Sequence, residues 1–421
     1  MDFEYKCSPY TTSSGFTKLM LLVMKTGENS MLVGKIKKLL KKDPDIINKK
    51  NTKGWTALIL ACRNSKTDSS EDTVKILIDV GADLNIKNNE GWTALMMASR
   101  NSKTDSSENT VKILIDVGAD LNIKNNGGWT ALMMASRNSK TDSSENTVKI
   151  LIDAGTNLNL QEVNGNTALM MASRHSKTDS SEDTIKILID AGADLNIKNN
   201  DGWTALMMAS RNSKTDSSEN TVKILIDAGA DLNIKNNNGW TALMLACGYS
   251  KTDSSEETIK ILIDAGADLN LKNNDGYSAL IIAIQNKTDS SENTVKILIE
   301  EGSDLNILDD NGKNALKHAI DANIIDLYIT AILSKNSIET YKQIHKEINY
   351  KTVLKHIPKQ NKIVRFDIQN MGYKITELNF KLKIEIHTNI YKTLDSKLIN
   401  YLSITDENDM VFKVKQYLYN N

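Results

Sequence analysis

A short pattern, a glycine followed three and four residues later by Ala-Leu, recurs along most of this chain at a nearly fixed period. Its glycines are Gly54, Gly91, Gly128, Gly165, Gly202, Gly239, Gly276 and Gly312, so six intervals are 37 residues long and the last is 36. A sequence with a period of about 20–50 residues folds as stacked units, each burying its apolar surface against its neighbours. We therefore expect one long array to occupy most of the 421 residues.

Within one period the residue pattern predicts two helices. Residues 93–99 form a compact apolar segment rich in Ala, Leu and Met, and a second apolar segment at 111–115 precedes Gly118. Gly118 stands where a helix C-terminus needs a positive φ. Pairs such as Asn238-Gly239 predict tight turns between units. The expected unit is helix, loop, helix and turn, so the fold class is mainly α.

These residues resemble the ankyrin-repeat family. Gly91-Trp92-Thr93-Ala94-Leu95 is similar to the family pattern G-x-T-P-L-H, and residues 111–122 are similar to V-x-x-L-L-x-x-G-A-D-x-N. The similarity recurs from about residue 51 to 316 and implies an ankyrin-repeat solenoid, with units starting near residues 51, 88, 125, 162, 199, 236, 273 and 309. The chain also resembles ankyrin proteins of amoeba-infecting giant DNA viruses in three features: the segment TALMMAS, the bias toward Asn and Lys, and the long loop.

The sequence departs from the family pattern at two positions. Ala94 replaces the family's Pro, and Met96 replaces its His. In the family this His helps to hydrogen-bond neighbouring repeats. We therefore expect cohesion between these repeats to depend more on apolar contacts.

Composition changes along the chain predict four regions. We expect a flexible N-terminus at 1–14, an N-terminal capping repeat at 15–50, the repeat array at 51–333, and a small C-terminal α or α+β domain at 334–421. One interpretation makes this last domain a cap over the apolar face of the final repeat. The alternative rests on residues 397–406, which resemble an F-box helix and imply a substrate-recruiting adaptor of a ubiquitin ligase.

The string KTDSSE recurs seven times between the two helices of a unit. Ankyrin units usually have about 33 residues, so the four additional residues of each period fall in this loop. Asp105 and Glu108 have the spacing of a helix N-cap and the third residue after it, which predicts a capping box. A phosphorylation site is the alternative, because the loop is expected to be exposed.

Few residues in the sequence point to catalytic or metal chemistry. The three cysteines, Cys7, Cys62 and Cys247, make no disulfide framework, and the five histidines have no recurrent partners. With 52 basic and 53 acidic side chains, the chain lacks the positive excess of a nucleic-acid binder. The apolar run at 19–24 is too short to span a membrane. We expect no enzyme activity, cofactor, metal, nucleic acid or membrane, and a monomer in the cytoplasm, that of the host if viral.

Aromatic and arginine side chains recur at two fixed positions of the unit. The resemblance implies that the residue after each glycine and the end of the first helix line a concave face that binds a partner protein, a host protein if the chain is viral. Trp and Arg dominate the binding energy of many protein interfaces. The alternative is structural, with each Arg stacked on its Trp as a cation–π pair. The predicted binding residues are Trp55, Arg63, Trp92, Arg100, Trp129, Arg137, Arg174, Trp203, Arg211, Trp240 and Tyr277.

Overall fold

The computed structural model describes residues 5–6, 12–13, 15–27, 31–286, 290–322 and 324. The chain divides into two units, Met1–Asp268 and Leu269–Asn421. The C-terminal domain expected at 334–421 and the F-box-like stretch at 397–406 lie outside the described residues.

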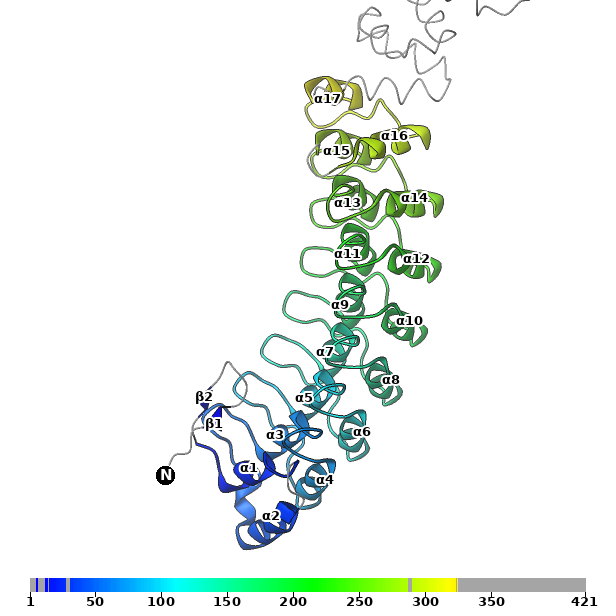
Figure 1. The fold of residues 1–421 in the computed structure, drawn as a ribbon. Coiled ribbons are helices and arrows are strands. Elements are labelled where there is room, and N and C mark those ends of the chain that lie inside the picture. The colour runs from blue at the N-terminus through cyan, green and yellow to red at the C-terminus, as the bar shows by residue number, and fades with distance from the viewer. Residues whose placement is uncertain are drawn as a thin grey trace, which may run out of the picture. The chain divides into compact units, whose positions relative to one another are not determined.

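The first unit is a stack of helix pairs that we number as repeats 1 to 6 (Figure 1). Their first helices are α3 (Ala57–Arg63), α5 (Ala94–Arg100), α7 (Ala131–Arg137), α9 (Ala168–Arg174), α11 (Ala205–Arg211) and α13 (Ala242–Gly248). Their second helices are α4 (Glu71–Asp79), α6 (Glu108–Asp116), α8 (Glu145–Asp153), α10 (Glu182–Asp190), α12 (Glu219–Asp227) and α14 (Glu256–Asp264). Within this unit the second helices lie on one side, and the stack bends toward the other side, where the first helices and the turns lie.

The same unit begins with five elements that precede repeat 1. Strands β1 (Tyr5–Lys6) and β2 (Thr12–Ser13) pair antiparallel. They are followed by α1 (Lys18–Val23), α2 (Met31–Lys42) and the 3-10 helix η1 (Pro44–Ile46). In the second unit, α15 (Ala279–Gln285) and α16 (Glu292–Glu300) form repeat 7, and α17 (Ala315–Asp321) begins repeat 8. The expected mainly helical repeat array is confirmed.

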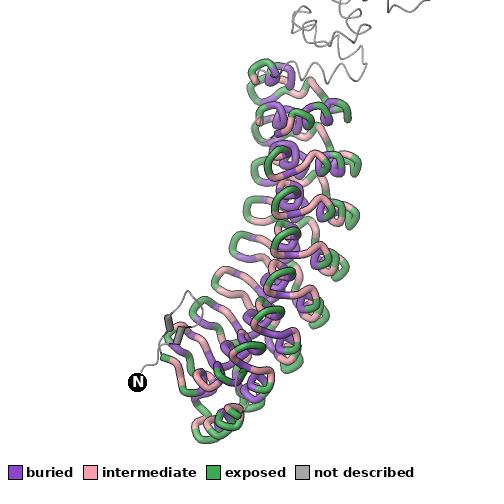
Figure 2. The backbone as a smooth tube through the Cα atoms, in the orientation of Figure 1, coloured by how far each residue is buried: buried purple, intermediate pink, exposed green. Residues whose placement is uncertain are grey.

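Local sequence explains the bounds of the two helices in each repeat. In α5 the Thr93 hydroxyl accepts a hydrogen bond from the Met96 amide at 3.3 Å, and residues 94–99 are all buried (Figure 2). The small Ala side chains allow the first helices of adjacent repeats to approach closely. The second helix α6 is amphipathic, since it buries Val111 and Leu114. It ends before Gly118, whose φ is +92°.

Gly91 shows why each turn needs a glycine. Its φ is +84°, and a Cβ at this position would lie 2.6 Å from the Asn126 amide nitrogen of the next repeat. The Asn126 amide donates to the Glu90 carbonyl at 3.0 Å, so consecutive turns are hydrogen-bonded to one another. A side chain at residue 91 would therefore both strain the backbone and separate the two turns.

The capping box expected at Asp105 and Glu108 is wrong. The N-cap of α6 is Ser107, which has extended backbone angles and accepts from the Thr110 amide at 3.0 Å. Asp105 lies in the preceding turn, where its carbonyl accepts from the amide of Lys66 in the previous repeat. Glu108 is the first residue of α6, and its carboxylate binds the next repeat instead of its own backbone.

The loops between the two helices are joined by buried hydroxyl groups. Thr110 Oγ1 donates to Ser65 Oγ of the preceding repeat at 2.7 Å, and Ser65 Oγ lies 3.1 Å from Ser106 Oγ. The same Thr-to-Ser bond, at 2.6 Å, joins Thr147 to Ser102, Thr184 to Ser139, Thr221 to Ser176 and Thr258 to Ser213. The expectation that cohesion depends more on apolar contacts was incomplete, because the loop serines and the threonines of the second helices also supply a polar connection between repeats.

Candidate functional site

The tryptophan residues of the first unit are placed by an asparagine in each turn. The Asn88 side-chain oxygen accepts from the Trp92 amide at 2.9 Å and from the Glu90 amide at 3.0 Å. Equivalent bonds of 2.8–2.9 Å place the other tryptophans, joining Trp55 to Asn51, Trp129 to Asn125, Trp203 to Asn199 and Trp240 to Asn236. Each of these tryptophans is half-buried, so part of a rigid indole stays accessible to solvent in five repeats of the first unit.

The arginine at the end of the first helix lies over the tryptophan of its own repeat. The distances from the guanidinium carbon to the ring centroid are 5.6 Å for Arg63 and Trp55, 5.5 Å for Arg100 and Trp92, 5.7 Å for Arg137 and Trp129, and 5.9 Å for Arg211 and Trp203. This is the cation–π arrangement that the sequence suggested. We call these four pairs the Trp–Arg row.

Stacking does not remove either side chain from solvent. Arg100 is exposed, while Arg63 and Arg137 are partly exposed. A guanidinium that stacks through its face still points its N–H groups outward in its own plane. Each pair therefore offers apolar area and hydrogen-bond donors at the same point, which is the combination found in the strongest contacts of protein interfaces.

Arg211 is held more firmly than the other arginines of the row. Besides Trp203, its guanidinium carbon lies 4.5 Å from the Tyr249 ring centroid of the next repeat. Its Nη2 atom also lies 3.9 Å from a carboxylate oxygen of Asp253. These contacts occupy both the face and the edge of the guanidinium.

Repeat 4 interrupts the row at Asn166, which stands where the other repeats of the first unit have an aromatic ring. The Asn166 side-chain nitrogen donates to Glu162 at 2.7 Å, and its oxygen accepts from Asn199 of repeat 5 at 2.9 Å. Arg174, at the end of α9, is exposed, and no aromatic ring stacks on it in the described part of the chain. The structure thus gives Arg174 a different environment from that of the other arginines.

The two remaining predicted residues have other neighbours. Trp240 has no arginine in its own repeat, because Gly248 ends α13. Tyr277 belongs to the second unit, where its amide donates to Asn273 at 2.8 Å and its ring meets His318 edge-on at 5.6 Å between centroids.

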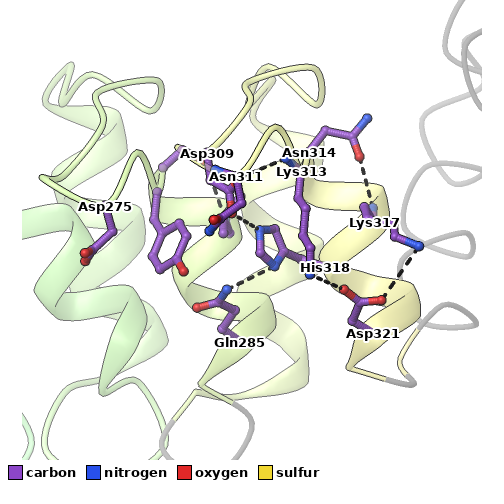
Figure 3. Close-up of polar contacts among 12 residues, drawn as sticks. Asp275, Gln285, Asp309, Asn311, Lys313, Asn314, Lys317, His318 and Asp321 are labelled. Atoms are coloured by element: carbon purple, nitrogen blue, oxygen red, sulfur yellow. Dashed lines mark hydrogen bonds and ion pairs between the residues drawn. The ribbon is translucent and has the colours of Figure 1, made fainter.

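Sequence reasoning missed a buried polar cluster in the second unit (Figure 3). His318 is 6% exposed, and its Nε2 atom lies 3.0 Å from a carboxylate oxygen of Asp309, while Nδ1 lies 3.0 Å from the Gln285 amide nitrogen. Two departures from the repeat could have revealed it. Asp309 stands at the position of Asn88, and His318 stands at the position of Met97.

Electrostatics favour a charged Asp309 in this cluster. Burial by itself would raise the pKa of Asp309, but the amides of Lys313 and Asn311 and the ring of His318 together hold that pKa below its ordinary value. The two amide bonds measure 2.8 and 2.9 Å. Nearby, Lys313 Nζ lies 2.9 Å from Asp321, which raises the pKa of Lys313 and lowers that of Asp321. The contacts from Asp309 to His318 and from Lys313 to Asp321 link the turn to α17, so the cluster has a structural role.

Reactive groups are scarce among the described residues. Cys62 and Cys247 are fully buried, and burial raises the pKa of each thiol, which makes them poor nucleophiles. In the part of the chain that the structure describes, no group of three or more His, Cys, Asp or Glu side chains could hold a metal ion. No helix in the same part is long and apolar enough to cross a membrane.

Comparison with known proteins identifies the repeats. The family model for ankyrin repeats (3 copies) matches residues 19–125, 103–199, 176–273 and 249–343. Two similar relatives are the ankyrin repeat proteins L88 and L289 of Acanthamoeba polyphaga mimivirus, 42% identical over 87 residues and 45% identical over 94 residues, each match covering 20% of this chain. These matches span only 10% and 17% of the two relatives' lengths. Among solved structures, the ankyrin repeat domain of Bcl-3 aligns with a TM-score of 0.48 at 25% identity, covering 56% of this chain and 98% of that domain.

Proposed function

Because this chain belongs to the ankyrin-repeat family, whose repeats are protein-interaction modules, we propose that it is a non-catalytic scaffold that binds a partner protein through the Trp–Arg row. The partner contacts the side of the first unit on which the first helices and turns lie. The similarity to mimivirus proteins supports a viral origin, with a host protein as the partner and the host cytoplasm as the place of action.

The observation that carries this proposal is the stacking of a half-buried tryptophan with an arginine in successive repeats. Three consecutive repeats have the pair without interruption: Trp55 with Arg63, Trp92 with Arg100 and Trp129 with Arg137. Indole and guanidinium groups held rigidly in advance lose little conformational entropy on binding. We therefore place the centre of the interface on repeats 1 to 3.

The test compares variants of the full chain in affinity purification from amoebal cells, with quantification of every captured protein. Trp92→Ala and Arg100→Ala should each weaken capture of the partner by roughly fivefold to thirtyfold, the effect of losing about 1–2 kcal/mol at an interface. Lys112→Ala is the matched control, because Lys112 is exposed on the second helix of the same repeat.

Thermal unfolding of each variant separates binding from folding. If Trp92→Ala lowers the melting temperature strongly while its folded fraction captures the partner normally, the tryptophans serve packing alone and the binding surface is elsewhere. Equal capture of the partner by the unaltered chain and all three variants would also show that the binding surface is elsewhere.

A further inference from the structure

Two substitutions that contact each other interrupt the Trp–Arg row at repeat 4. Where the other repeats of the first unit have Asn and Trp, repeat 4 has Glu162 and Asn166. Glu162 is 5% exposed and accepts from both the amide and the side chain of Asn166, at 3.2 and 2.7 Å. The side-chain nitrogen of Asn199 donates to the side-chain oxygen of Asn166 at 2.9 Å, so Asn166 is fixed in the turn. Repeat 4 therefore has no aromatic ring at this position.

Because of this change, Arg174 has no aromatic ring in its own repeat on which to stack. In the described part of the chain its guanidinium has no hydrogen bond, ion pair or ring contact, and the side chain is exposed. Arg211 in the next repeat has two rings and a carboxylate around it. A guanidinium with a free planar edge is suited to bind a carboxylate through two parallel hydrogen bonds.

Arg174 lies near charges of both signs, and the two flanking repeats carry aromatic rings. The pKa of the neighbouring His175 is lowered, first by burial and then by the positive charges of Arg137 and Arg174, against the smaller opposing effect of Asp179 and Asp216. Repeats 3 and 5, which flank it, carry the indole rings of Trp129 and Trp203. Apolar groups around a charge pair exclude water and strengthen the attraction between the charges.

We propose that the partner protein places an Asp or Glu side chain at repeat 4, where its carboxylate pairs with Arg174 and its neighbouring apolar residues contact Trp129 and Trp203. This inference rests on the proposed function, and adds to it the chemical character of the partner at one position. Charge complementarity selects an acidic group, because Arg174 is an exposed guanidinium that forms no ion pair with any described residue.

The test is a selection of binders to the full chain from a displayed library of random peptides. Peptides are recovered with the unaltered chain and then measured against Arg174→Gln, Trp129→Ala and Trp203→Ala. Lys186→Gln is the matched control, since it removes one positive charge from the exposed surface of the second helix in the same repeat.

The expected result is a set of peptides that share an acidic residue beside apolar residues. Their affinity should fall about fivefold or more in Arg174→Gln, and should stay unchanged in Lys186→Gln. Peptides that require Trp129 and Trp203 but show no acidic preference, or bind Arg174→Gln as well as the unaltered chain, would overturn this inference and leave the proposed function standing. A library that yields no peptide dependent on the tryptophans would overturn both.

Discussion

At the scale of single residues, one buried position distinguishes repeats of the same array. Ser99, Ser136, Ser173 and Ser210 are fully buried, and within the described residues their hydroxyl oxygens have no hydrogen-bond partner. Cys62 and Cys247 occupy the same position in repeats 1 and 6. A buried hydroxyl without a partner loses its hydration and gains nothing in return, whereas a thiol is more apolar and costs less to bury.

Ser136→Cys should therefore raise the free energy of unfolding by about 1 kcal/mol, measured by chemical denaturation. The matched control is Ser143→Cys, because the Ser143 hydroxyl is equally buried but donates to the Ser99 carbonyl at 2.7 Å. That variant should lower stability by about 1–2 kcal/mol. A loss of stability in Ser136→Cys of the same size as in the control would show that the Ser136 hydroxyl is paired in solution.

Asp309 gives a second prediction at this scale, through its lowered pKa. A carboxyl whose pKa is lower in the folded state stabilises the protein above its unfolded pKa of about 4 and loses that contribution as the pH falls through the folded pKa. Asp309→Asn keeps an oxygen for the amides of Lys313 and Asn311, as Asn88 does in repeat 2, but cannot titrate. The stability difference between the two proteins should shrink between pH 5 and strongly acidic pH. A constant difference over this range would contradict the prediction.

At the scale of elements, the loop between the two helices of a repeat is a connector to its neighbours. The Lys103 amide donates to the Asp142 carbonyl at 3.0 Å, and the Lys103 ammonium donates to the Lys140 carbonyl at 2.9 Å. Ser107 Oγ donates to Glu71 of the preceding repeat at 2.5 Å. The recurrent KTDSSE string therefore has a structural use at most of its positions, although phosphorylation of an exposed residue in it stays an untested alternative.

Substitutions at Glu108 and Asp105 distinguish the connection between repeats from helix capping. Glu108 accepts hydrogen bonds from Ser144 and from Asn146, the latter at 2.5 Å, both in the next repeat. Glu108→Ala should lower the free energy of unfolding by about 1–2 kcal/mol, since it leaves two donors without their charged acceptor. Asp105→Ala should change it by less than about 0.5 kcal/mol, as expected for a surface substitution. If Asp105→Ala proves the more damaging in urea denaturation, the capping box exists in solution after all.

At the scale of the whole molecule, stability should depend on complete periods. Within the first unit, adjacent repeats contact each other through their turns, loops and helices. Many of these contacts join residues 37 positions apart, such as the bond from the Lys103 ammonium to the Lys140 carbonyl. Stability in such an array is the sum of each repeat's own contribution and that of its contacts with its neighbours.

Deletion of residues 128–164 removes one period and joins Gly127 to Gly165 in register. This variant should remain soluble and keep the helical circular dichroism expected for its length. Deletion of half a period should expose the apolar faces of helices and cause aggregation. Similar behaviour of the two deletions would show that the 37-residue segment is not the structural unit.

The sequence by itself determined the helical class, the length of the unit, the glycine at each turn and the spacing of the tryptophans and arginines. These follow from periodicity and backbone conformation, which act between residues close in the chain. Only the tertiary structure decided that Ser107 and not Asp105 caps α6, that Thr110 reaches Ser65 of another repeat, and that Arg174 lacks the ring its equivalents have. The bond from Thr110 to Ser65 joins residues more than one period apart, while the cap and the missing ring depend on the local geometry of a loop and a turn. Hydrogen bonds are too short-ranged for sequence spacing to specify which groups meet.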